Sequence, residues 1–152
     1  MQKLDYKACY VNGYSFYNAA KQLGTVHVTN GNVSDLNIGW NVVPTIVNYA
    51  FAAELGLKAI IGNEKGDIPH IHKLDQLFTE LPAAVRQLLL ATVSNSLSVA
   101  EDEVSALIKS HSNTFTDWRY FAFNPKNISV DNVFLSKFCD AIYQYIGKEL
   151  KL

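Results

Sequence analysis

The stretch "VVPTIVNYAFAAELGLKAII", Val42 to Ile61, decides the fold, because it is apolar on nearly every side of a helix. Pro44 is tolerated in a first turn, where its missing N–H group has no partner to lose, and Gly62 follows as a natural helix stop. A helix with so little polar surface must be covered by other elements. We therefore predict a central helix over Val42–Ile61, surrounded by the rest of the chain.

The region before this helix divides into two parts of different character. Residues 14–23 have the period of a modest amphipathic helix that ends at Gly24. Residues 25–40, "TVHVTNGNVSDLNIGW", are β-branched and rich in turn formers, with Asn30 and Gly31 as a hairpin-type pair. The sequence thus predicts one helix followed by an irregular loop or a small hairpin.

The C-terminal half has helical period throughout. A stripe of apolar residues at i, i+3, i+4 and i+7 predicts a short helix, followed by "PAAVRQLLLATVSNS" with Pro82 at its first position. The stripe consists of Leu74, Leu77, Phe78 and Leu81.

Two further helices complete the prediction. Ser98 and Glu101 have capping-box spacing before the first, and Ser129 is the predicted N-cap of the last, over residues 130–146. One face of that last helix carries Val133, Phe134, Phe138, Ile142 and Ile146. At 152 residues, the chain fits a single domain over residues 1–152. The predicted fold is an all-α, up-and-down bundle of five to six helices.

Composition restricts the classes of partner. With 13 Lys and Arg against 14 Asp and Glu, the chain has no global field for nucleic acid or an anionic membrane, so nucleic-acid binding must be local. Apolar runs such as "LLLATV" are too short to span a bilayer, and the N-terminus lacks the apolar region of a secretory signal. We therefore expect a cytoplasmic protein without a membrane partner. Cys9 and Cys139 are then expected to be packed thiols.

A pair of charges interrupts the central helix. Glu54 and Lys58 share one helical face, with the acid before the base, among residues that otherwise predict burial. A buried carboxylate needs hydrogen-bond donors. The planar fork of Arg119, in "FTDWRYFAFNP", is the predicted partner of Glu54 across the bundle. Arg119 is thus interpreted first as a structural tie and second as a binding residue whose aromatic neighbours stack a base.

Histidines supply the other reactive groups. His70 and His72 form an H-x-H, but they point apart on a helix and have no third ligand at matching spacing, so no metal site is predicted. His72 is predicted to face the Glu54 and Lys58 end of the central helix, with a solvated histidine at a helix start as the alternative. No phosphate-loop, nucleophile-elbow or zinc-protease motif occurs, and no cofactor is expected.

Several segments together resemble the HEPN superfamily of small helical-bundle domains. They are "YAFAAELGLKAII", "HKLDQLFTELP", "VRQLLL" and "FTDWRYFAF", and the resemblance covers roughly residues 40–146. Its most specific part is the acid-x-x-x-Lys helix followed by His-x-Leu-x-x-Leu-Phe. The resemblance implies a bundle that commonly forms a homodimer. It also implies a role in prokaryotic toxin–antitoxin, phage-defence or RNA-processing systems, or as a nucleotide-binding module.

The chain departs from the family at the catalytic motif. Active HEPN ribonucleases carry an Arg followed, after four to six residues, by a His, whereas Arg86 and Arg119 precede "QLLLATV" and "YFAFNPK". We therefore expect a non-catalytic or atypical module that binds a nucleotide, RNA or a protein partner. Two alternatives stay open: a metal-independent RNA-cleaving enzyme with a rearranged Arg/His site, and a purely structural dimeric protein. The candidate ligand-binding residues are Glu54, Lys58, His72 and Arg119.

Overall fold

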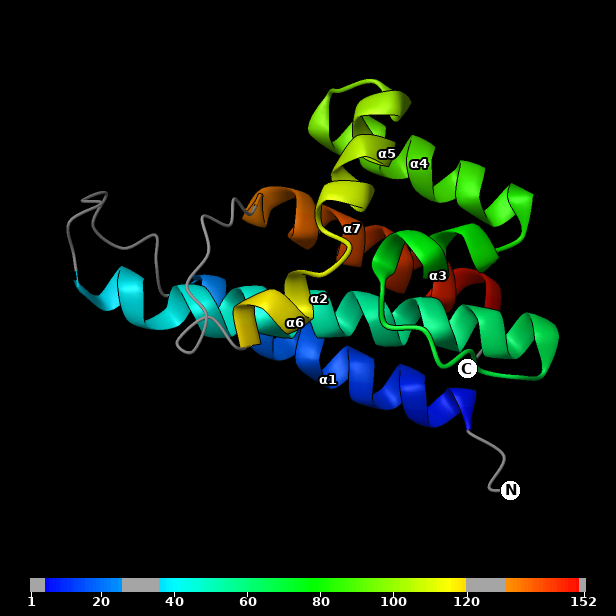
Figure 1. The fold of residues 1–152 in the computed structure, drawn as a ribbon, viewed down its shortest axis with the longest axis horizontal. Helices are drawn as coiled ribbons and strands as arrows, with labels where there is room; N and C mark the ends of the chain where they lie inside the picture. Colours follow the sequence, from blue (N-terminus) through cyan, green and yellow to red (C-terminus); the bar gives the residue numbers. More distant parts are fainter. Residues whose placement is uncertain (1–4, 26–35, 120–130, 151–152) are drawn as a thin grey trace.

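The computed structural model describes residues 5–25, 36–119 and 131–150, and these form seven α-helices, one π-helical turn and no strand (Figure 1). The predicted all-α bundle is confirmed. It has more helices than expected, because residues 101–119 divide into two short helices. The elements are α1 (Tyr6–Thr25), α2 (Leu36–Lys65), α3 (Leu74–Glu80), α4 (Ala83–Leu97), α5 (Glu101–Ser110), α6 (Thr114–Arg119), α7 (Asn132–Tyr145) and η2 (Ile146–Leu150).

Helix α2 is the central element, in contact with α1, α3, α6 and α7. Its core-facing side chains, such as Leu57 and Ile60, are fully buried. The stretch Asn41–Lys65 is 25 residues long and apolar enough to span a bilayer by composition, yet 78% of its most apolar window is buried inside the bundle. It therefore resembles the core helix of a soluble protein.

The predicted helix Val42–Ile61 was too short at both ends. The helix begins at Leu36, so the expected loop through residue 40 is wrong from residue 36 onward, and Pro44 lies inside the helix. The helix also continues past Gly62, where a Cβ atom would lie 2.6 Å from the Tyr6 Cβ of α1. Gly66, with φ of +73°, ends it by donating its N–H to the Gly62 carbonyl at 2.9 Å. Gly62 therefore allows close packing rather than helix termination. The predicted turn at Asn30 and Gly31 lies outside the described residues.

Helix α1 is longer than the predicted 14–23 and lies along α2 (Figure 1). Its N-terminal half lacks a stripe of aliphatic side chains, because tyrosines supply much of its apolar face. The Tyr17 ring stacks on Tyr143 of α7 at 5.0 Å, and Tyr10 and Tyr14 also contact that ring. The first helix thus packs mainly along α2, and the tyrosine contacts attach it to α7 as well.

Helix α7 packs on another side of α2. The Tyr143 hydroxyl donates to the Ala52 carbonyl at 2.7 Å, and the Cys139 thiol donates to the Tyr49 carbonyl at 3.2 Å. Asp131 caps this helix by accepting the Phe134 N–H, whereas the predicted cap Ser129 lies outside the described residues. On the predicted apolar face, Val133 is the exception at 62% exposure. Its partners Phe134, Phe138, Ile142 and Ile146 are fully buried.

The short helices cover the remaining side of the core. The apolar stripe predicted for α3 is buried as expected, and α4 begins directly after Pro82. The predicted capping box is wrong. Ser98 adopts the left-handed conformation, with φ of 56°, and closes the C-terminus of α4, while α5 begins at Glu101 without a side-chain cap.

Candidate functional site

Three of the four predicted site residues converge at one side of α2. Lys58 Nζ and His72 Nδ1 each lie 2.8 Å from the same oxygen, Oε1 of Glu54. Glu54 is 2% exposed and Lys58 8%, whereas the side chain of His72 is 71% exposed. The cluster is therefore a buried ion pair with an imidazole at its surface.

The segment between α2 and α3 brings His72 to this position. It folds back on α2, so that Ile68 is buried and would lie 3.0 Å from a Cβ atom at Gly62. Its far end is held where the Leu74 N–H donates to the Ser112 carbonyl at 3.2 Å. Because both ends are attached, His72 is held over Glu54.

Hydrogen-bond chemistry assigns the roles in this cluster. A carboxylate only accepts, so Nδ1 of His72 carries a hydrogen and donates it to Oε1, while Nε2 lies on the opposite edge of the ring. In the part of the chain that the structure describes, Nε2 has no hydrogen-bond partner, and neither has the buried Oε2 of Glu54. At such a position, Nε2 of an imidazole accepts a hydrogen bond from a ligand when the ring is neutral and donates one when the ring is protonated.

Cys9 of α1 lies within electrostatic range of the same cluster. Burial raises the pKa of the Cys9 thiol above its ordinary value, the Lys58 ammonium opposes that rise, and the carboxylates of Asp5 and Glu54 add to it. Cys9 is thus a protonated, unreactive thiol at neutral pH. Sequence reasoning missed this neighbour, because the N-terminal half of α1 carried no recognisable helical pattern.

The predicted pairing of Arg119 with Glu54 is wrong. Oε1 of Glu54 is occupied by Lys58 and His72, and Arg119 is exposed at the last residue of α6. Its guanidinium carbon lies 5.7 Å from the centre of the Phe115 ring. An exposed guanidinium keeps its hydration, whereas Glu54 takes donors from α2 itself and from the adjoining segment. The interpretation of Arg119 as a buried tie is therefore overturned.

Arg119 instead ends a ladder of aromatic rings. Phe115 of α6 stacks on Phe51 of α2 at 4.7 Å, and Phe51 meets Phe16 of α1 edge-on at 4.7 Å. The ladder attaches α6 to the bundle. Phe51 and Glu54 are three residues apart, so the groups that they hold lie on neighbouring turns of α2.

The remaining histidines have other roles. His111 is 3% exposed, donates from Nδ1 to the Leu107 carbonyl at 2.8 Å and accepts the Asp131 N–H at Nε2 at 2.9 Å. It therefore joins α5 to the start of α7. His70 is exposed, and among the described residues no group of three or more His, Cys, Asp or Glu side chains is placed to hold a metal ion.

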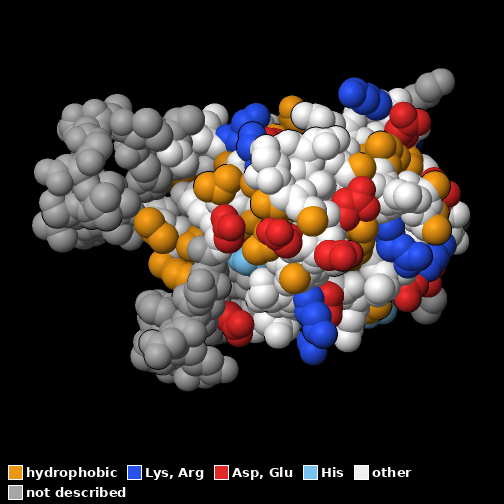
Figure 2. Space-filling model, turned by 90° about the horizontal axis from the view of Figure 1, so that it is seen from above, with side chains coloured by type: hydrophobic (Ala, Val, Ile, Leu, Met, Phe, Trp, Pro, Cys, Tyr) orange, Lys and Arg blue, Asp and Glu red, His pale blue; other side chains and the backbone are white. Residues whose placement is uncertain are grey.

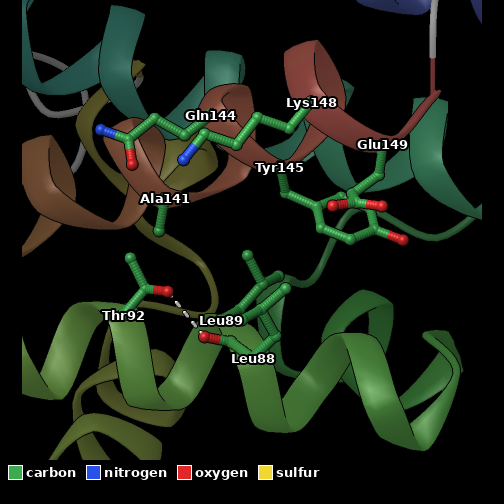
Figure 3. A pocket seen from close by; sticks show the side chains of 8 residues that line it. All are labelled: Leu88, Leu89, Thr92, Ala141, Gln144, Tyr145, Lys148 and Glu149. Carbon is green, nitrogen blue, oxygen red and sulfur yellow. Dashed lines mark hydrogen bonds between the residues drawn. The ribbon is translucent and has the colours of Figure 1, made fainter.

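Cavities lie elsewhere on the bundle. One, of about 220 Å³, separates α4 from the end of α7 and η2, where Leu88 and Leu89 face Ala141 across the gap (Figure 3). Another, of about 400 Å³, lies between α1, α2 and α7. None of the four predicted site residues lines either cavity.

The cluster thus combines the buried pair of Glu54 and Lys58 with the exposed imidazole of His72. No protein-family model matches the chain, and no match is found among curated proteins or solved structures. The resemblance to the HEPN superfamily accordingly stays a prediction.

Proposed function

We propose that this chain is an atypical HEPN-like module of the cytoplasm that binds a phosphate-bearing ligand, a nucleotide or RNA, at the surface around His72. The observation that carries this proposal is the exposed imidazole held from beneath by a buried carboxylate. A side chain fixed before binding loses less conformational entropy when the ligand arrives. Once protonated at Nε2, the imidazole donates a charge-assisted hydrogen bond to a phosphate oxygen.

Arg119 supplies a second contact in this proposal. Its exposed guanidinium lies over the Phe115 ring, and Phe115 stacks on Phe51 of α2. Phe51 lies one helical turn before Glu54. A planar guanidinium binds phosphate through two parallel hydrogen bonds. His72 and Arg119 can thus contact neighbouring phosphates, or the phosphate and the base of one nucleotide.

The charge distribution requires such local contacts. Basic and acidic side chains are interspersed over the face seen in Figure 2, and the net charge is −1. Long-range attraction therefore contributes little. With about two phosphate contacts, log K for single-stranded RNA should fall with log salt at a slope of only about −1.4.

The test is ligand-induced stabilisation with matched histidine variants. Purified chain is heated with adenine and guanine nucleotides and with a short single-stranded RNA. A ligand at 100 times its dissociation constant adds about 2.7 kcal/mol to the free energy of unfolding. His72→Ala should abolish the shift in melting temperature, whereas His70→Ala, two residues away and also exposed, should retain it. If no nucleotide or RNA shifts the melting temperature, or if both variants lose the shift equally, the proposal fails.

RNA cleavage is the second candidate function, favoured by the Nδ1 contact to Glu54, which leaves Nε2 of His72 available for proton transfer. Within the described residues, His72 is hydrogen-bonded to Glu54 rather than to Arg119, so this candidate ranks below binding. An active enzyme would release fragments with 2′,3′-cyclic phosphate ends, and His72→Ala would stop their release. Intact RNA after prolonged incubation would exclude it. If neither ligand class binds and the chain sediments as a dimer, the purely structural role remains.

A further inference from the structure

The cavity between α1, α2 and α7, of about 400 Å³, has the chemistry of a second binding site. It lies between the end of α1, α2 and the first half of α7, and its volume is within the usual range for small-molecule sites. Its lining includes Lys21, Tyr49, Asn132, Val133, Ser136 and Asp140. Tyr49 precedes Glu54 by five residues, which places the cavity about 140° around α2 from the His72 cluster.

Tyr17 holds two opposite charges on the wall of this cavity. Its hydroxyl donates a hydrogen bond to Oδ1 of Asp140, and Lys21 Nζ lies 4.8 Å from the centre of its ring. Burial raises the pKa of Tyr17, and the bond to Asp140 raises it further, so the hydroxyl remains a donor. No ion pair joins Lys21 to Asp140 among the described residues. Tyr17 therefore contacts both charged side chains, the Asp140 carboxylate through its hydroxyl and the Lys21 ammonium through its ring.

Both charges retain capacity for a ligand. Among the described residues, Oδ2 of Asp140 forms an ion pair with Lys137 Nζ at 3.7 Å, a distance too long for a hydrogen bond. Asp140 has a side chain that is 29% exposed, and Lys21 is an exposed residue. Ser136 of α7 and the buried Tyr49 of α2, whose side chains are hydrogen-bonded to each other, also line the cavity.

The order of the charges follows from the helix directions. Helices α1 and α7 run in opposite directions (Figure 1), so Lys21, one turn after Tyr17, lies toward the start of α7. The Asp131 carboxylate caps the N-terminal end of α7 and offsets the partial positive charge there, so the positive charge at this end of the cavity comes from the Lys21 ammonium. The cavity is thus positive at one end and negative at Asp140.

We propose that this cavity binds a small zwitterion of the α-amino acid class, with its ammonium group on Asp140 Oδ2 and its carboxylate on Lys21 Nζ. A simple anion would meet the carboxylate of Asp140, and a simple cation would meet the ammonium of Lys21. A molecule with both charges satisfies both ends, which is the basis of the selectivity. In an open site of this size, we expect a dissociation constant on the order of 0.1 to 1 mM.

The test is an NMR titration of the full chain with free alanine, glutamate and phenylalanine as probes. The controls are N-acetylalanine, which lacks the ammonium group, and ethylamine, which lacks the carboxylate. At least one amino acid should shift the amide signals of Ser136 and its neighbours saturably, and both controls should bind about tenfold more weakly or less. Absence of saturable shifts at millimolar amino acid, or equal binding of either control, would overturn the proposal.

Matched variants test the assignment of the two charges. Lys21→Met and Asp140→Asn should each weaken binding at least about tenfold, and the amide oxygen introduced by the second change can still accept the Tyr17 hydroxyl. The same charge changes at exposed positions of α5, Lys109→Met and Glu103→Gln, should leave binding unchanged. Unaltered binding in both cavity variants would contradict the site. His72→Ala should also leave amino acid binding unchanged, so this proposal and the phosphate-binding proposal can fail separately.

Discussion

Nδ1 of His72 lies 2.8 Å from Oε1 of Glu54, which joins a side chain that is 71% exposed to one that is 2% exposed. The same oxygen accepts from Lys58 Nζ at 2.8 Å. One buried carboxylate therefore connects the central helix to the segment that leads into α3. Its loss would release His72 and leave the Lys58 ammonium buried without its counterion.

Replacement of Glu54 should destabilise the fold, because the Lys58 ammonium then stays buried without a counterion. Glu54→Leu is expected to lower the free energy of unfolding by about 3 to 5 kcal/mol, because Lys58 stays buried and unpaired. The double variant with Lys58→Met should recover most of this loss. Glu80→Gln, which breaks the half-exposed pair with Lys65, should cost no more than about 1 kcal/mol. Urea unfolding gives the free energy of unfolding of the parent chain and of the three variants. A Glu54→Leu variant as stable as the parent would contradict the buried pair.

Two glycines should respond oppositely to alanine. At Gly56, a Cβ atom would lie 2.5 Å from Cγ2 of Ile142, so Gly56→Ala should destabilise the fold by about 1 to 3 kcal/mol despite the better helix propensity of alanine. At Gly147, the corresponding space is open, and Gly147→Ala should cause no loss. Thermal unfolding compares the two variants. Equal melting temperatures would show that α2 and α7 are not so closely packed.

Ser98 distinguishes a helix end from a helix start. Because its φ is 56°, Ser98→Gly should relieve backbone strain and raise the free energy of unfolding by up to about 1 kcal/mol. Ser98→Ala should have little effect. A capping serine would behave differently, since its replacement by alanine costs about 1 kcal/mol. Chemical unfolding of both variants decides between the two roles.

Buried tyrosines should make the fold sensitive to alkali. Burial raises the pKa of Tyr17 and of Tyr143 well above the ordinary value near 10, so the folded state favours their protonated forms. Their contribution to stability is complete below about pH 10 and is lost as the pH rises further, by at most about 1.36 kcal/mol per unit for each group.

The corresponding variants test this dependence directly. Tyr143→Phe should flatten the alkaline decrease in the free energy of unfolding, although the lost hydrogen bond to Ala52 lowers stability at every pH by about 1 kcal/mol. Tyr14→Phe, at a residue 43% exposed, should leave the slope unchanged. Urea unfolding between about pH 8 and 11 gives the slopes. Identical slopes for Tyr143→Phe and the parent chain would contradict a protonated, buried Tyr143.

Local pattern was sufficient for several elements. The apolar character of Val42–Ile61 predicted the central helix, and the spacing of Leu74, Leu77 and Phe78 predicted α3. Helical period depends on neighbours three and four residues away, which a single sequence displays. For the same reason, the sequence also predicted that Glu54 and Lys58 share a helical face.

Helix ends were less predictable, because they depend on contacts from distant parts of the chain. Gly62 resembles a helix stop in the sequence, but α2 continues through it to Lys65, and the missing side chain of Gly62 leaves room for Tyr6 of α1. The N-terminal half of α1 lacks an aliphatic stripe and is held partly by the tyrosine contacts with α7. In both places, the deciding contact lies far away in the sequence.

The sequence by itself therefore determined an all-helical bundle around a hydrophobic central helix, with an acid and a base on one of its faces. Only the tertiary structure decided which donors reach that acid. His72 reaches Glu54 because its segment folds back on α2, whereas Arg119 stands on Phe115 at the exposed end of α6. The spacing of residues along the sequence determines which groups share a helical face, but the packing of separate segments determines the partners of a buried charge.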